Sequence, residues 1–185
     1  MKENNIKKIA FVGTLCSGKT TLLDLYRKKH EGDKKVAVVR ESARTFFEEN
    51  PGIDRSSIET QSKIQDLVIK SEREAHESGA EIIFCDRSVL DAAVYQRAFS
   101  DKSGSEKLLQ RVEFWIPTYH KILLLNPSDC IYSTDAIRNE DEKTRDHIHN
   151  NFIELFEEKH LPYEILRGNI DMRVKRIDEI TTGDI

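Results

Sequence analysis

The residues whose types and spacing indicate chemistry most clearly occupy positions 13–21 and read GTLCSGKTT. They match the Walker A pattern G-x-x-x-x-G-K-[ST], with the apolar run IAFV before it and TLLDLY after it. Gly13 and Gly18 let the backbone turn with positive φ, so that successive N–H groups point at phosphate oxygens. The motif therefore predicts a phosphate-binding loop (P-loop) that holds a nucleoside triphosphate.

Individual residues of this loop have distinct expected roles. Lys19 would bring a positive charge to the β and γ phosphates, and the Thr20 hydroxyl could ligate Mg²⁺. Cys16 occupies a variable position of the pattern, so we expect an inert filler there rather than a redox switch. The predicted ATP-binding residues are Gly13, Thr14, Leu15, Cys16, Ser17, Gly18, Lys19, Thr20 and Thr21.

Two further groups of charged residues follow apolar runs. VAVVRESAR places Glu41 and Arg44 after one run, and EIIFCDRS places Asp86 and Arg87 after another. Open parallel sheets bind ligands beyond the carboxyl ends of their strands, so both groups are expected at the edge that carries the P-loop. The alternative is that each acid lies at an exposed helix start, where it interacts with the helix dipole. Their common edge favours the functional interpretation.

The chemistry expected of these residues follows from their types. Glu41 could accept a proton or hold a water on Mg²⁺, while Arg44, three residues later on the same helix face, would meet an anion. Asp86 fits a Walker B acid that orients Mg²⁺, and Arg87 fits phosphate neutralisation. A structural ion pair is expected for Asp91. The predicted substrate-binding residues are Glu41, Arg44, Asp86 and Arg87, and the predicted metal-binding residues are Thr20 and Asp86.

A distal segment, TDAIRNEDEKTR, carries Arg138 and Arg145 seven residues apart, which is two turns along one helix face. An ordinary exposed charged helix is the simpler interpretation. If the segment, about 130–147, folds over the P-loop as a lid, these arginines could stabilise charge on a transferred phosphoryl group. Gly168 and Asn169 could form a turn against the adenine. The candidate catalytic residues are therefore Lys19, Glu41, Arg87, Arg138 and Arg145.

The elements that must position these residues alternate along the chain. Apolar runs predict strands at 9–12, 36–39, 82–84, 122–125 and 163–166. Continuous apolar strands are typical of a parallel sheet buried on both faces, so the fold class is a three-layer α/β domain. A capping box of Ser56 and Glu59 predicts a helix to about Ser78, stopped by Gly79. Further helices are expected over 138–160 and, shortly before a frayed TTGDI tail, around 173–180.

Bulk composition limits the remaining possibilities. The 185 residues suit a single domain, 1–185, and no apolar run is long enough to cross a bilayer, which argues against a membrane partner. Three separated cysteines and the lack of a signal-peptide pattern predict a cytoplasmic protein. The net charge of −4 argues against nucleic acid as a partner. The oligomeric state stays open, a homodimer included.

The order GTLCSGKTT, VVRESAR, IIFCDRSVLDA, DAIRNEDEKTR and YEILRGN resembles the P-loop kinase-like ATPases grouped with the nicotinamide riboside kinase domain. More distantly it resembles the deoxynucleoside and thymidylate kinases. The resemblance implies a five-stranded parallel sheet of nucleotide-kinase type, ATP with Mg²⁺, and an arginine-bearing lid. Glu41 resembles the general base of deoxynucleoside kinases, although SAR follows it instead of their proline pattern. Asp86, Arg87 and Ser88 resemble those enzymes' acidic-Arg-Ser motif.

These observations favour an ATP-dependent kinase, a transferase that moves the γ-phosphoryl group to a nucleoside-like or nucleotide acceptor. A simple ATPase is a lesser variant of that expectation. The alternative is a nucleotide-binding regulatory ATPase, a switch that acts through a protein partner. A signalling GTPase is disfavoured because the chain has no N-K-x-D motif, and a nucleic-acid end kinase would need a basic groove. Which of Glu41 and Asp86 is the base, and which serves Mg²⁺, is not decided by the sequence.

Overall fold

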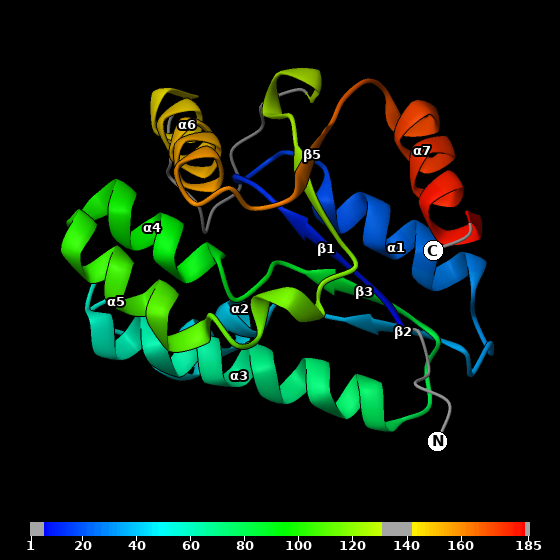
Figure 1. Cartoon of the computed structure of the whole chain (residues 1–185), viewed down its shortest axis with the longest axis horizontal. Helices are drawn as coiled ribbons and strands as arrows, with labels where there is room; N and C mark the ends of the chain where they lie inside the picture. Colours follow the sequence, from blue (N-terminus) through cyan, green and yellow to red (C-terminus); the bar gives the residue numbers. More distant parts are fainter. Residues whose placement is uncertain (1–5, 131–141, 184–185) are drawn as a thin grey trace.

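The computed structural model describes residues 6–130 and 142–183, and these residues contain one five-stranded parallel sheet in the order β2-β3-β1-β4-β5 (Figure 1). The strands are β1 (Lys7–Val12), β2 (Val36–Val39), β3 (Ile82–Asp86), β4 (Lys121–Leu125) and β5 (Tyr163–Leu166). All five predicted strands and the three-layer α/β fold class are confirmed. In the β1–β3 register Phe11 lies opposite Asp86, so the P-loop begins beside the end of β3.

Helices cover both faces of the sheet, which is why its strands are continuously apolar. They are α1 (Lys19–Lys29), α2 (Ser42–Glu49), α3 (Ile58–Glu77), α4 (Asp91–Phe99), α5 (Lys102–Val112), α6 (Glu142–Glu158) and α7 (Ile170–Thr182). One core contains Leu22 and Tyr26 of α1 with Ile177 of α7, and the other core joins α3, α4, α5 and α6. Figure 1 shows α1 and α7 together on one side of the sheet. No helix among the described residues is long and apolar enough to span a membrane.

The start of α3 differs from the predicted capping box. Ser57, not Ser56, is the N-cap, and its side chain accepts from the Thr60 N–H at 3.1 Å. The Ser56 hydroxyl instead donates to Asp54 at 2.7 Å, because Asp54 forms a local turn immediately before the helix. Gly79 follows the helix with φ +86°, as expected for a glycine stop.

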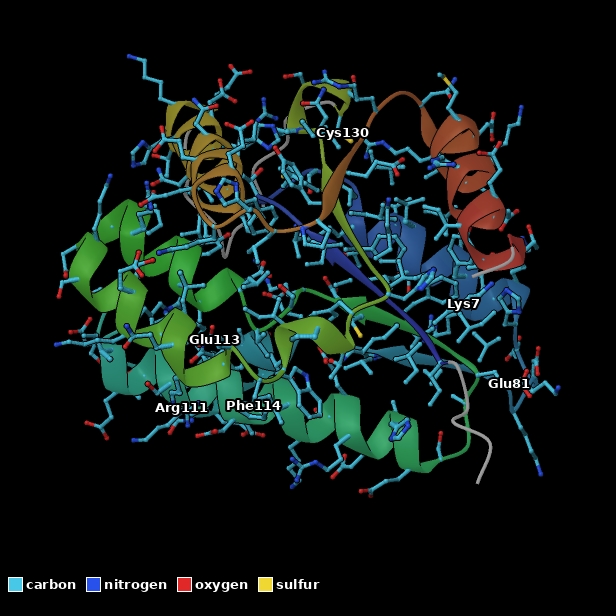
Figure 2. All side chains as sticks on the ribbon, in the orientation of Figure 1. Lys7, Glu81, Arg111, Glu113, Phe114 and Cys130 are labelled. Atoms are coloured by element: carbon cyan, nitrogen blue, oxygen red, sulfur yellow. The ribbon has the colours of Figure 1, made fainter. Side chains whose placement is uncertain are left out.

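The C-terminal helix is longer than predicted. It begins at Ile170, where the Asn169 side chain accepts from the Met172 N–H, and it continues through both threonines of the expected frayed tail. Lys7, labelled in Figure 2, donates to the carbonyls of Thr181 and Gly183 at 2.9 and 2.5 Å, which ties the helix end to β1. The charged helix expected from position 138 is described from Glu142 onward.

Candidate active site

The P-loop joins β1 to α1 with the backbone that the glycine pattern requires. Gly13 has φ +135° and Gly18 has φ +91°, conformations that favour glycine. A Cβ on Gly13 would lie 3.2 Å from the Leu125 carbonyl oxygen of β4. Gly18 directly precedes α1, and no side chain caps the first N–H groups of that helix. The loop therefore directs a helix N-terminus into the site, the arrangement that binds phosphate.

Lys19 is folded back onto the loop. Its Nζ donates to the carbonyls of Gly13 at 2.8 Å and Thr14 at 2.6 Å, and to the Ser17 hydroxyl at 3.3 Å. Burial, followed by the nearby charge of Arg87, lowers the pKa of Lys19 to about 8. These contacts hold the ammonium against the backbone of the P-loop.

Arg173 of α7 contacts the P-loop backbone. This residue was not identified from the sequence as part of the site. Its guanidinium donates to the Ser17 carbonyl at 2.6 Å and to the Asn126 carbonyl beyond β4 at 2.8 Å. The side chain is 2% exposed, and Asp129 lies 3.4 Å away. A Cβ on Gly18 would meet Arg173 at 3.1 Å and Cys130, labelled in Figure 2, at 3.2 Å. Arg173 thus clamps the P-loop to the loop after β4.

We expect Arg173→Met to weaken ATP binding and lower stability, because it leaves two buried carbonyls without their charged donor. The free energy of unfolding should fall by about 3 kcal/mol, whereas the matched variant Arg176→Met should cost less than about 1 kcal/mol. Arg176 lies on the same helix, but it is 44% exposed and pairs with Glu164. Calorimetric ATP titration and thermal unfolding measure both effects. Equal losses in the two variants would contradict the clamp.

Arg87 links the two acidic groups that the sequence placed at this edge. Its Nε donates to Glu41 at 2.7 Å and its Nη1 donates to Asp91 at 3.1 Å. Arg87 itself has φ +77°, an uncommon conformation for a residue other than glycine. The predicted structural ion pair of Asp91 is confirmed, and Asp91 also accepts from the Ser88 N–H at 2.8 Å.

Asp86 and Thr20 line a common cavity of about 440 Å³ beside the end of β2. Asp86 Oδ1 is buried and has no hydrogen-bond partner among the described residues, and burial raises the pKa of this carboxyl. A hydroxyl and an orphaned carboxylate oxygen fit Mg²⁺, which takes a few protein oxygens together with water and substrate phosphates. No group of three or more His, Cys, Asp or Glu side chains that could hold a metal ion occurs in the described residues.

A second cavity, of about 650 Å³, is lined by Glu41, by Arg87 and by Leu15 of the P-loop. Its walls come from α2, from the loop before α3, and from α4, and they include the aromatic rings of Phe47, Tyr95 and Phe99. The Arg55 guanidinium lies 4.5 Å from the centre of the Phe47 ring. A smaller cavity of about 90 Å³ adjoins it and shares Glu41, Phe47 and Arg87. Aromatic walls with a few convergent charges are typical of small-molecule sites.

The remaining predicted site residues have mixed placements. Arg44 lines the 650 Å³ cavity with Glu41, and its Nε donates to Glu48 at 3.0 Å. Arg145 is 4% exposed and pairs with Glu142 at 3.1 Å, so it is not the exposed helix residue of the simpler interpretation. Gly168 donates its N–H to Asp129 at 2.8 Å. The side-chain oxygen of Asn169 caps α7. Arg138 and most of the expected lid lie outside the described residues.

The sheet order, the P-loop and the cavity together define a P-loop protein with a nucleotide-kinase-like fold. Over residues 8–173 the chain matches the family model described as AAA domain. The protein therefore belongs to this AAA-domain family. Comparison with curated proteins gave no match.

Solved structures extend the likeness of the fold. NadR protein in complex with NR aligns at a TM-score of 0.74 and 19% identity, covering 98% of this chain and 51% of NadR. Thymidylate kinase from Ehrlichia chaffeensis aligns at 0.66 and 18%, covering 96% and 99%. Deoxyadenosine kinase from M. mycoides with bound dATP aligns at 0.66 and 16%, covering 96% and 100%. The chain thus spans about half the length of NadR, and identities this low show the fold alone.

Proposed function

We propose that the protein transfers the γ-phosphoryl group of MgATP to a nucleoside-like or nucleotide acceptor. One observation supports this most directly: the Glu41–Arg87 pair, joined at 2.7 Å, lines a 650 Å³ aromatic cavity that Leu15 of the P-loop also lines. A protein that only bound a nucleotide would need no cavity for a second small molecule beside the P-loop. The similarity to NadR, thymidylate kinase and deoxyadenosine kinase in fold agrees with this proposal.

On the ATP side, the P-loop amides and the start of α1 bind the phosphates, and Lys19 moves from the Gly13 and Thr14 carbonyls to the β and γ phosphates. Thr20 and Asp86 would hold Mg²⁺, which would neutralise charge on the phosphates. We assign Asp86 to the metal because its orphaned oxygen shares a cavity with Thr20 and does not line the aromatic cavity. We assign Gly168 and Asn169 to the adenine side of the nucleotide.

On the acceptor side, we assign Glu41 as the general base. Glu41 lines both the 650 Å³ aromatic cavity and the 440 Å³ cavity that contains Thr20 and Asp86. An acceptor hydroxyl gives its proton to the Glu41 carboxylate as its oxygen bonds to the γ-phosphorus. The bond from that phosphorus to the β–γ bridging oxygen breaks, and ADP leaves with the electron pair. Arg87 and Arg44 face the incoming phosphoryl group, and Arg145 of α6 would supply a further positive charge. Arg138 stays a candidate for the same role from the sequence alone.

The test is ATP consumption by the purified protein with Mg²⁺, alone and then with nucleosides, nicotinamide riboside and nucleoside monophosphates, with products identified by mass. We expect one acceptor to gain the mass of a phosphoryl group and ATP loss without acceptor to be slow. Tight ATP binding with no product from any acceptor would contradict the proposal. That outcome would favour the regulatory switch acting through a protein partner, and the single domain would then be a binding module.

A further inference from the structure

The segment after β3 carries Arg87 in its left-handed conformation, and every backbone N–H from 87 to 90 has a defined partner. The Arg87 N–H donates to the Phe11 carbonyl of β1 at 3.0 Å. The Ser88 N–H donates to Asp91, and the Leu90 N–H donates to the Ser88 hydroxyl at 3.2 Å. These three contacts are made by the neighbouring strand β1 or by residues close by in the chain.

Val89 is the exception, because its backbone is held by side chains from distant elements. Its N–H donates to the Tyr119 hydroxyl oxygen at 3.1 Å, and its carbonyl accepts from Gln65 of α3 at 3.0 Å. Val89 is fully buried, so water cannot replace either partner. The path of the chain through Arg87 therefore depends on Tyr119 and Gln65.

The Tyr119 hydroxyl is itself fixed by a buried ion pair. It donates to Glu72 Oε1 at 2.7 Å, which leaves its oxygen lone pairs for the Val89 N–H. The other oxygen of Glu72 accepts from Lys8 at 2.6 Å and from the Trp115 ring nitrogen at 2.7 Å. Glu72 is 1% exposed and Lys8 is 5% exposed.

Lys8 is further held between two rings, at 4.5 Å from the centre of Trp115 and 4.3 Å from that of Tyr119. Buried charges are costly unless every member of the network is satisfied, and here each of these groups has a partner. None of Lys8, Glu72 and Tyr119 lines the two cavities beside Arg87. The Tyr119 hydroxyl connects this network to the segment after β3 through the Val89 N–H.

We propose that Tyr119, oriented by the Glu72–Lys8 pair, is a positioning residue that fixes the β3–α4 segment so that Arg87 holds Glu41 at the acceptor cavity. The inference rests on the proposed function for its catalytic consequence. Its structural part, the anchoring of the Val89 N–H by one remote hydroxyl, stands on the contacts alone.

Tyr119→Phe tests this by removing one oxygen while keeping the ring against Lys8. In protein without added ligand, the Val89 amide should exchange with deuterium at least about tenfold faster than in the wild type, as measured by NMR. Amides in the middle of β1 should change their exchange rate only as much as global unfolding does. In the transfer assay kcat should fall by about 10- to 100-fold with the KM for ATP unchanged, because a displaced Arg87–Glu41 pair affects the acceptor side.

Tyr26→Phe is the matched control. Tyr26 is also buried and its hydroxyl also bonds a carboxylate, Asp178 at 2.9 Å, but it lies on the other face of the sheet. It should lower stability without changing kcat or Val89 exchange. If Tyr119→Phe does not fold, Gln65→Met, which removes the partner of the Val89 carbonyl, should give the same exchange and kcat changes.

Unchanged Val89 exchange in Tyr119→Phe would overturn the inference, as would unchanged kcat or an equal loss of kcat in Tyr26→Phe. A wild-type protein that phosphorylates nothing would instead refute the proposed function. In that case the exchange measurement still decides whether Tyr119 controls the segment.

Discussion

Lys19→Ala should reduce phosphoryl transfer by at least about 10²-fold, the loss typical when one preorganised charge is removed from a transition state. Phosphoryl transfer needs little covalent help and depends on such charges. The Lys19 ammonium is held by carbonyl oxygens of its own loop, so it is positioned at the P-loop itself. The measurement is the single-turnover rate of the variant at saturating ATP. Lys28→Ala, on the exposed side of α1, is the control and should keep the wild-type rate.

The same lysine predicts the pH dependence of the reaction. Since burial lowers the pKa of Lys19 to about 8, the free protein loses this charge as pH rises through that value. The kcat/KM for ATP reports groups of the free protein, so it should fall above pH 8 toward a tenfold loss per pH unit. At saturating ATP, kcat should not show this fall, because bound phosphate favours the charged form of the lysine. A kcat/KM that stays level to pH 10 would show that Lys19 keeps its proton in the free protein.

Local patterns explain what could be predicted from the sequence. The P-loop is contiguous, and its glycine and lysine positions depend on backbone geometry that one short segment determines. The strands were predictable because a sheet covered on both faces demands uninterrupted apolar runs. The same parallel order predicted that Glu41, Asp86 and Arg87 meet at the carboxyl edge of the sheet.

Contacts between distant residues explain what could not be predicted. Arg173 reaches the Ser17 carbonyl across 156 positions, and its sequence context is that of an ordinary amphipathic helix. Tyr119 follows a short helical turn, and nothing in its surroundings indicates the Val89 N–H as its partner. Side chains that bond backbone leave no residue-type complement in the sequence. The capping error at Ser56 has a related cause, since Asp54 takes the hydroxyl that the pattern assigned to the helix.

Glu41→Gln should preserve ATP binding and reduce transfer to a hydroxyl acceptor by about 10²- to 10⁴-fold, the range contributed by a general base. The amide oxygen of glutamine can still accept from Arg87 Nε, now 2.7 Å from the carboxylate, so the pair should keep its geometry. The substitution removes the ability to take a proton together with one negative charge. ATP affinity by calorimetry and the single-turnover transfer rate measure binding and transfer separately.

Glu48→Gln is the matched control, because Glu48 lines the same cavity but its carboxylate pairs with the exposed Arg44. An equal loss of transfer in both variants would mean that cavity charge, and not proton transfer at Glu41, determines the rate. The size of the Glu41→Gln effect also distinguishes the two acceptor classes. A hydroxyl must lose its proton as it attacks, whereas the phosphate of a nucleoside monophosphate is already ionised at neutral pH and needs no base. A loss of 10²-fold or more would therefore indicate a nucleoside-like acceptor, and a loss of less than about tenfold would indicate a nucleotide.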